Sequence, residues 1–164
     1  MSLFTIDFDR RIESTLPASE LWRLMKEAFE NPAQSSIWPV ELEEVEPVEL
    51  KRHAQVKATY KFGPIRMSPT YHITHVHQER NFSYESDRSH PLAGGATVEV
   101  EAHGSGSTLR WHGAYRPRIH PFALGAMLFV RLYFLRTFFT HLQRNIRHYE
   151  DSYTQPTYDA PRAQ

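Results

Sequence analysis

An arginine lies in the middle of the most apolar stretch of the chain, the segment ALGAMLFVRLYFLRTFF at residues 123–139. With a helical step of about 100° per residue, Arg131 falls on the same face as Leu128, Leu135 and Phe138. A buried guanidinium needs a carboxylate, a carbonyl or a ligand as its partner, because an unpaired buried charge is strongly destabilising. We therefore predict that Arg131 points inward and anchors the carbonyl, enolate or carboxylate group of a bound molecule. The alternatives are an ion pair that belongs to the scaffold, or a head group that reaches water at the helix edge.

Three histidines in the segment YHITHVHQ could take part in acid–base or metal chemistry. In a strand, His75 and His77 lie on one face and His72 lies on the other. An H-x-H pair can ligate zinc, iron or copper, but it needs further ligands, and the chain has no cysteine and no HExxH motif. We predict that no metal and no other cofactor is bound. If His75 faces a cavity, it can serve as a general acid or base.

Aromatic residues recur on the apolar phase of the expected strands. They are Tyr60, Tyr71, Tyr84, Trp111 and Tyr115. Tyrosine and tryptophan combine a large apolar area with a hydroxyl or N–H group that must find a partner. Each of them alone could be ordinary core. Together they predict a cavity with apolar walls and a few polar groups, which is the usual character of a small-molecule site.

Composition excludes several classes of function. The 164 residues contain 19 Lys+Arg and 19 Asp+Glu, so no net charge attracts the protein to nucleic acid. The chain has no cysteine, and its first residues, MSLFTIDFDRR, lack the apolar run of a signal peptide. We therefore expect a reducing, cytoplasmic setting. The uncharged run from Pro121 to Val130 is about half of the ~20 residues that a membrane-spanning helix needs.

The hydrophobic periodicity predicts the elements that hold these residues. A strand at residues 4–12 is followed by a helix that begins near Pro17 and by a second short helix or turn that ends at Trp38-Pro39. Strands are expected within 40–50, 55–62, 67–76, 82–84, 97–103 and 109–116, and one long helix within about 121–151. This order predicts an α+β fold in which an antiparallel sheet of about seven strands curves around the C-terminal helix. We expect one domain over residues 1–153 and a disordered tail over 154–164.

This arrangement resembles the helix-grip fold of the START-like, or SRPBCC, superfamily, which includes polyketide cyclases, birch-pollen-allergen-like proteins and lipid-binding relatives. The resemblance depends on LPASELWRLMKEAFENPAQSSIWP, which is similar to the family's proline-led helix and short second helix. YHITHVHQERNFSYES is similar to its long strand, turn and short aromatic strand. The resemblance implies two short helices after the first strand and a cavity between the sheet and the C-terminal helix.

The leading hypothesis is that this cavity binds, sequesters or transports a hydrophobic small molecule such as a lipid, a quinone or a polyketide-like compound. The predicted ligand-binding residues are Arg131, Tyr60, Tyr71, His75, Tyr84, Trp111, Tyr115, Leu128, Leu135 and Phe138. A second hypothesis is a cyclase or dehydratase in which Arg131 stabilises an enolate and a tyrosine or His75 moves the proton. A third is a weak homodimer or a membrane-surface contact, because Phe129 and Val130 fall on the polar side of the predicted helix.

Overall fold

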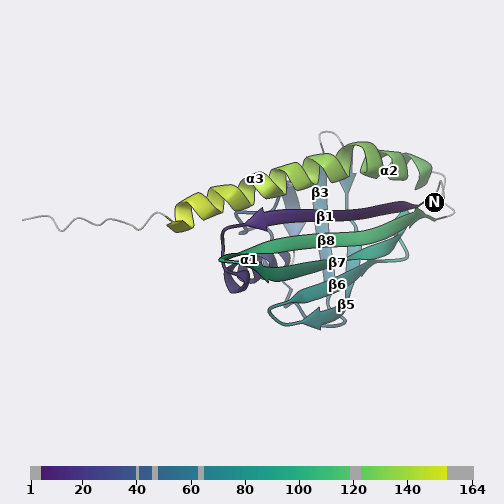
Figure 1. Cartoon of the computed structure of the whole chain (residues 1–164). Coiled ribbons are helices and arrows are strands. Elements are labelled where there is room, and N and C mark those ends of the chain that lie inside the picture. The colour runs from purple at the N-terminus through teal and green to yellow at the C-terminus, as the bar shows by residue number, and fades with distance from the viewer. Residues whose placement is uncertain (1–4, 40, 46–47, 63–64, 119–122, 155–164) are drawn as a thin grey trace, which may run out of the picture.

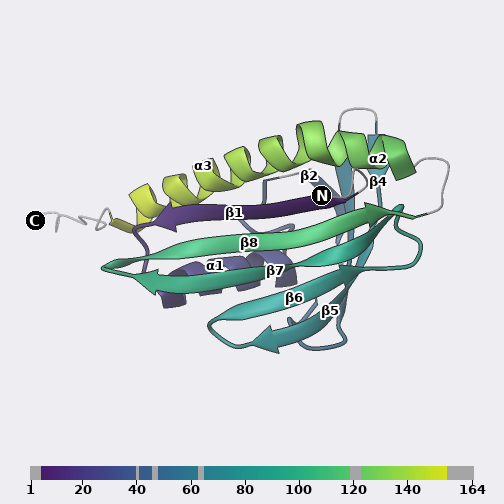
Figure 2. The ribbon, with the colours of Figure 1, turned by 45° about the vertical axis from the view of Figure 1, so that its right-hand side comes forward.

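The computed structural model describes residues 5–39, 41–45, 48–62, 65–118 and 123–154. In this part of the chain an antiparallel sheet curves beneath one long C-terminal helix (Figures 1 and 2). The strands are β1 (Ile6–Ser14), β2 (Glu41–Val45), β3 (Gln55–Phe62), β4 (Ile65–Met67), β5 (Thr70–His77), β6 (Asn81–Ser86), β7 (Leu92–His103) and β8 (Gly106–Pro117). The helical elements are α1 (Ala18–Glu30), α2 (Ala123–Phe129), a π-helical turn (Val130–Phe134) and α3 (Leu135–Thr154).

The eight-stranded sheet has the order β1-β8-β7-β6-β5-β3-β2, with β4 paired to β3 outside this path. The paired strands are antiparallel throughout. The predicted α+β fold, a curved antiparallel sheet with a long C-terminal helix, is therefore confirmed. The short strand β4 raises the strand number slightly above the prediction.

Two glycines allow the central strands to approach each other closely. A Cβ atom on Gly95 of β7 would lie 1.9 Å from the carbonyl oxygen of Tyr84 on β6. A Cβ atom on Gly113 of β8 would lie 2.3 Å from the carbonyl oxygen of Gly95. Glycine has no Cβ, so β6, β7 and β8 can coil together at this level. Gly95 pairs with Glu85, the residue after Tyr84, and Gly113 lies between Trp111 and Tyr115 in β8, so this close approach is next to the aromatic side chains of the concave face.

The helices bury their apolar faces on this sheet. Helix α1 packs against β7 and β8, α2 against the same two strands, and α3 against β1. The buried side chains of α1 are Leu21, Trp22, Leu24, Met25, Ala28 and Phe29, and those of α3 are Leu135, Phe138, Phe139, Leu142 and Ile146. Among the described residues, no helix combines the length and the apolarity that a membrane crossing needs.

Hydrogen bonds fasten the C-terminal end of α3 to the first strand and the first helix. Glu150 Oε1 accepts hydrogen bonds from the Ser14 hydroxyl at 2.6 Å and from the Thr15 N–H at 3.0 Å. The Tyr149 hydroxyl donates to Glu20 Oε1 at 2.6 Å. The end of α3 is thus fixed by directed polar contacts as well as by apolar packing.

Three local features differ from the predicted elements. The segment after α1 is a hydrogen-bonded turn at Asn31, which is one of the two forms that periodicity predicts, and not the second short helix that the family resemblance implies, because Pro32 and Pro39 limit how far a helix can extend. Strand β7 begins at Leu92, five residues before the predicted strand at 97–103. The predicted uniform helix contains the π-helical turn. The predicted disordered tail lies outside the described residues, apart from Thr154, which ends α3.

Candidate ligand-binding cavity

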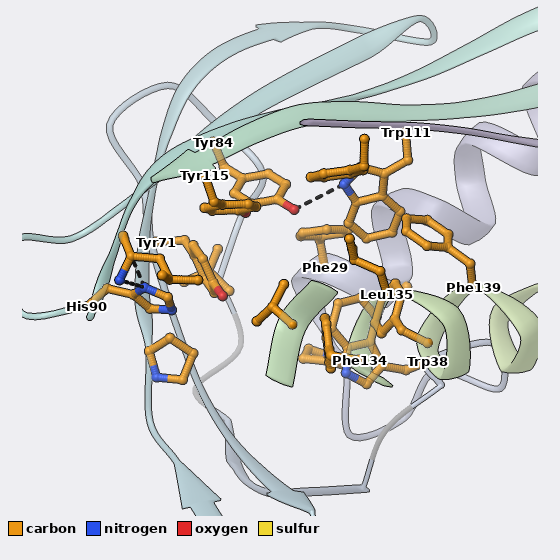
Figure 3. A pocket seen from close by; sticks show the side chains of 18 of the residues that line it. Phe29, Trp38, Tyr71, Tyr84, His90, Trp111, Tyr115, Phe134, Leu135 and Phe139 are labelled. Atoms are coloured by element: carbon orange, nitrogen blue, oxygen red, sulfur yellow. Dashed lines mark hydrogen bonds between the residues drawn. The ribbon is translucent and has the colours of Figure 1, made fainter. Parts of the chain in front are cut away.

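A cavity of about 100 Å³ lies between the concave face of the sheet and the helices (Figure 3). Its wall is apolar and aromatic, with few polar groups. The lining residues are Phe8, Ala28, Phe29, Pro32, Trp38, Val56, Pro69, Tyr71, Ile73, Tyr84, His90, Leu92, Trp111, Tyr115, Phe129, Val130, Phe134, Leu135, Phe138 and Phe139. None of these described lining residues is Asp, Glu, Lys or Arg, so the wall has no fixed charge of its own.

The sheet side of the cavity is a set of aromatic rings. The Trp111 indole N–H on β8 donates a hydrogen bond to the Tyr84 hydroxyl on β6 at 3.0 Å. Tyr71 on β5 makes an edge contact with Tyr84, with ring centroids 5.3 Å apart. Phe8 on β1 stacks on Tyr115 of β8 at 6.0 Å. These side chains all come from the concave face of one curved sheet, and Figure 3 shows Tyr71, Tyr84, Trp111 and Tyr115 gathered on this side of the cavity.

The helix side of the cavity is built around the π-helical turn. The N–H of Leu135 donates to the carbonyl oxygen of Val130, five residues earlier, where an α-helix would bond residues four apart. Such a turn contains one residue more than the α-helical repeat. Val130, Phe134 and Leu135 therefore all line the cavity. Turns of this kind are frequent at functional sites.

His90 is the titratable side chain with the deepest burial among the described lining residues. It is 7% exposed, and its ring lies 5.8 Å from the ring of Tyr71 at one end of the cavity (Figure 3). Its Nδ1 is 2.9 Å from the carbonyl oxygen of Leu92 and 3.0 Å from the Leu92 nitrogen. A protonated Nδ1 donates to the carbonyl, whereas a bare Nδ1 accepts from the N–H. The imidazole is thus held by the backbone in either tautomer.

Burial lowers the pKa of His90 below its ordinary value of 6.5, and the charge of Arg118 lowers it further, while the bond to Leu92 opposes the shift. The imidazole is therefore neutral at neutral pH and offers one donor and one acceptor. Arg118 also fixes the backbone of this turn, because its Nε donates to the His90 carbonyl at 3.0 Å and its Nη2 to the Asp87 carbonyl at 3.2 Å.

Asp87 forms a polar cluster on the outer side of this turn. Its Oδ2 lies 3.0 Å from His72 Nε2, and its Oδ1 accepts from the Ser89 N–H at 2.9 Å. The contact with His72, followed by the bonds from Ser89, holds the pKa of the Asp87 carboxyl well below its ordinary range. Within the described ranges, no group of three or more His, Asp or Glu side chains could hold a metal ion. That no metal binds stays a prediction.

The structure brings six of the predicted ligand-binding residues together around the cavity. They are Tyr71, Tyr84, Trp111, Tyr115, Leu135 and Phe138. His75 is exposed on β5 and does not face the cavity, because a bulge in the β5–β6 register lies between Ile73 and His75. The predicted position of His75 is thus corrected. The side chain of Tyr60 lies outside the described residues.

Arg131 and Leu128 also lie away from the cavity. Arg131 is exposed, and Leu128 is 52% exposed. The predicted inward orientation of Arg131 is therefore wrong, and so is the outward orientation of Phe129 and Val130, which line the cavity. The physical cause is the π-helical turn. A helical wheel of about 100° per residue predicts the buried face of α3 correctly. The additional residue of the π-helical turn rotates all residues before the turn relative to that face.

Several lining residues were not predicted. Phe8 lies within the predicted strand at residues 4–12 and Phe29 within the predicted helix that begins near Pro17, but periodicity does not distinguish a cavity wall from filled core. Trp38 lies in an irregular segment that periodicity does not orient. His90 precedes Pro91 in a segment that the sequence predicts as a loop, and only its burial in the folded chain indicates a role.

The sequence and the fold both match known proteins. Residues 5–147 match the family model described as polyketide cyclase / dehydrase and lipid transport. A comparison with proteins of curated function finds no significant match. Among solved structures, Ara h 8.0201 is similar with a TM-score of 0.65 at 14% identity, and the alignment covers 90% of this chain and 99% of that one.

Two further solved structures have the same fold. Norcoclaurine synthase from Thalictrum flavum, solved as a point mutant with a transition-state analogue, aligns with a TM-score of 0.63 at 12% identity over 92% of this chain and 99% of its own. The di-domain ARO/CYC StfQ of the steffimycin biosynthetic pathway aligns with a TM-score of 0.69 at 9% identity over 92% of this chain and 52% of its own. At these identities the likeness concerns the fold alone. The family match over residues 5–147 and the shared helix-grip fold together place this chain in the polyketide cyclase/dehydrase and lipid transport family of the START-like, or SRPBCC, superfamily.

Proposed function

We propose that the chain binds a small, neutral, ring-shaped apolar molecule that carries one or two hydrogen-bonding groups. The observation that supports this proposal is the composition of the cavity wall. Its described lining side chains are apolar or aromatic and include no acidic or basic residue other than His90. A carboxylate or phosphate inside such a wall would lose its hydration without gaining a counter-ion, so a neutral ligand is favoured.

The size of the cavity favours a single ring. Its volume is about 100 Å³, whereas pockets for drug-sized ligands span roughly 300–1,000 Å³. A dry apolar cavity of about 150 Å³ is sufficient for benzene. A long lipid or quinone tail therefore requires the helix side of the cavity to move. A monocyclic phenol or ketone requires little movement.

The polar groups of the wall would orient such a ligand. The rings of Tyr71 and His90 are in contact at one end of the cavity, and the Tyr84–Trp111 pair lies on the sheet side. A ring bound between them can make edge contacts with the aromatic side chains and one hydrogen bond to the hydroxyl of Tyr71 or to the imidazole of His90. One well-placed hydrogen bond contributes about 0.5–1.5 kcal/mol, so it selects orientation more than it determines affinity.

The experiment combines native mass spectrometry with NMR. The purified protein is first examined for a co-purified apolar adduct. Then p-cresol, toluene and benzoate are titrated while the indole N–H resonance of Trp111 is followed. We expect shifts with p-cresol and toluene, with p-cresol binding more tightly, and none with benzoate. Binding of benzoate in preference to p-cresol would contradict the proposal of a neutral ligand.

A matched pair of variants locates the binding. Leu135→Trp adds a large ring to the cavity wall and should abolish the p-cresol shifts. Leu132→Trp makes the same change on a leucine that is 71% exposed on the same helical segment, and it should leave the shifts intact. Equal effects of the two variants would mean that the cavity is not the binding site.

A second candidate function is proton-transfer catalysis of the cyclase or dehydratase type. It is favoured by His90, a neutral histidine that is 7% exposed and touches Tyr71 in the cavity. A base with a pKa below 6.5 is unprotonated at neutral pH and can remove a proton next to a carbonyl group. Arg131 has no part in this mechanism, because it is exposed on the other side of the helical segment.

Deuterium exchange tests this second candidate. Phenylacetone in heavy water should exchange its α-protons faster with the wild type than with His90→Gln. The glutamine amide can still offer a hydrogen bond to the carbonyl group, so the affinities of the two proteins should differ by no more than about tenfold. Exchange no faster than buffer would leave binding as the function. The cytoplasmic setting, the single domain over residues 1–153 and the weak homodimer remain predictions of the sequence, and analytical ultracentrifugation tests the last of them.

A further inference from the structure

The outer side of the helical segment that closes the cavity is unusually apolar. Four large apolar side chains are more than half exposed there: Leu124, Leu128, Leu132 and Tyr133. Leu124, Leu128 and Leu132 are spaced four residues apart and so form one ridge. In Figures 1 and 2, α2 and α3 lie along the upper boundary of the molecule, with no labelled element over them. Exposed apolar patches of this kind mark interaction sites.

Exposed arginine side chains lie beside this ridge of leucines. From Arg116 to Tyr149 the sequence contains six arginines and no Asp or Glu, although the whole chain has a formal net charge of zero. Arg131 and Arg136 are exposed beside the leucines, and Arg144 and Arg147 are exposed farther along α3. The outer face of the helix is thus apolar at its N-terminal half and basic towards its C-terminal half.

We propose that this face, formed by Leu128, Arg131, Leu132, Tyr133 and Arg136, docks on an anionic membrane surface. A helix with leucine and tyrosine on its outer side and arginine beside them can lie in the headgroup region, where apolar side chains enter the acyl boundary and guanidinium groups bind lipid phosphates. Arginine can extend its charged head to that level while its stem stays among apolar groups. The proposal does not depend on what the cavity binds.

A second copy of the chain fits this face less well. In a two-fold symmetric dimer the same patch meets itself, so Arg131 and Arg136 of one copy would face those of the other. No carboxylate within residues 116–149 is available to separate these like charges. A membrane that contains anionic lipid supplies the missing negative charge across the whole face.

The same segment has its other side in the cavity wall. Val130 and Phe134 face the cavity, while Arg131, Leu132 and Tyr133, between them in sequence, face outward. A membrane that binds the outer side would therefore contact the element that closes the cavity. Docking would place the cavity within one helix diameter of the acyl boundary, where apolar molecules partition.

Because the chain has no cysteine, single cysteines can be introduced and labelled without background. Leu132→Cys and Tyr153→Cys both replace exposed apolar residues, at 71% and 52% exposure; Leu132 lies within the proposed face and Tyr153 at the C-terminal end of α3. Each is labelled with an environment-sensitive fluorophore and mixed with vesicles of phosphatidylcholine, with or without phosphatidylglycerol. We expect a blue shift at position 132 with phosphatidylglycerol only, and no comparable shift at position 153.

Charge variants complete the test by vesicle co-sedimentation. Arg131→Gln combined with Arg136→Gln should weaken binding about thirtyfold, and Leu132→Ser about tenfold. Arg11→Gln combined with Arg52→Gln removes the same charge from exposed arginines elsewhere and should have much less effect. The proposal is overturned if the vesicles leave position 132 unchanged, or if both arginine pairs matter equally. A concentration-dependent dimer that is lost in Leu132→Ser, without vesicle binding, would assign the face to a second copy instead.

Discussion

The indole N–H of Trp111 donates to the hydroxyl of Tyr84 across the width of strand β7, at 3.0 Å. Trp111 is on β8 and Tyr84 is on β6. On the intervening strand β7, Trp111 pairs with Val98 and Tyr84 pairs with Ala96. The small side chain of Ala96 leaves room for the bond to pass diagonally over β7. Both rings are buried, so this polar contact is shielded from water and rigidifies the cavity floor.

We expect Tyr84→Phe to lower the free energy of unfolding by about 1–3 kcal/mol, because it leaves the buried indole N–H of Trp111 without its acceptor. Trp111→Phe removes the donor together with part of the ring. In the double variant the losses should be less than additive, by about 1 kcal/mol. Urea unfolding of the four proteins measures this coupling, and strictly additive losses would mean that the bond contributes nothing to stability.

Arg131 leads to a second prediction, which follows from its exposure. Arg131→Leu should change the free energy of unfolding by no more than about 0.5 kcal/mol, because substitutions of exposed side chains usually change stability little. The affinity of the cavity for p-cresol should also be unchanged. A tenfold loss of p-cresol affinity would restore the anchoring role that the helical wheel predicts, and a marked loss of stability would indicate a scaffold ion pair.

The end of α3 provides a third prediction. Glu150→Ala removes the acceptor of the Ser14 hydroxyl and of the Thr15 N–H, so it should lower the free energy of unfolding by about 1–3 kcal/mol. The neighbouring Asp151 is exposed, and Asp151→Ala serves as the control with an expected effect below about 0.5 kcal/mol. The measurement is urea unfolding of both variants at neutral pH. Equal effects would mean that net charge at the helix end matters more than the bonds of Glu150.

The fourth prediction concerns pH. The pKa of His90 is lower in the folded protein than its ordinary value of 6.5, so the unfolded chain takes up the proton first as pH falls. Stability should therefore decrease as pH falls through 6.5, and this loss should end once the folded imidazole is also protonated. The pKa of Asp87 is lowered as well. Its contribution to the free energy of unfolding is lost only as pH falls below 3.8, the ordinary pKa of an aspartate side chain. The two effects are thus separated in pH.

His90→Gln tests this assignment, because the glutamine amide can still bond the backbone of Leu92 but does not titrate. Urea midpoints of the wild type and the variant are compared at pH values on either side of 6.5. The wild type should lose more stability than the variant over this interval. Parallel curves would show that another group causes the pH dependence and that His90 titrates normally.

The sequence predicts the fold well because alternation in strands and the apolar stripe of α3 are direct consequences of burial. Leu135 and Phe138 face inward as predicted, and Phe139, Leu142 and Ile146 are buried with them. Periodicity fails at the π-helical turn, because it assumes a constant angle per residue and cannot detect an additional residue in the backbone. It also cannot distinguish a cavity wall from filled core, and so Phe29 and His90 required the folded chain.

The last prediction tests whether the additional residue of the π-helical turn determines which side chains before the turn face the cavity. Deletion of Leu132 removes one exposed residue from the turn and restores α-helical spacing between Val130 and Leu135. Met127 and Val130 then keep their inward positions, as do Leu135 and Phe138, so the fold should survive with a change in unfolding free energy of about 1–2 kcal/mol or less. Deletion of Thr140, which is also exposed but lies in regular α-helix, rotates the two parts of α3 on either side of it by about 100° relative to each other. Because that rotation removes several buried side chains from the core, the Thr140 deletion should destabilise the protein by more than about 4 kcal/mol or prevent folding.

Thermal and urea unfolding of the two deletion variants measures this difference in stability, and circular dichroism verifies that the helix content is kept. If both deletions are equally harmful, the additional residue is not confined to the turn, and the outward orientation of Arg131 needs another cause.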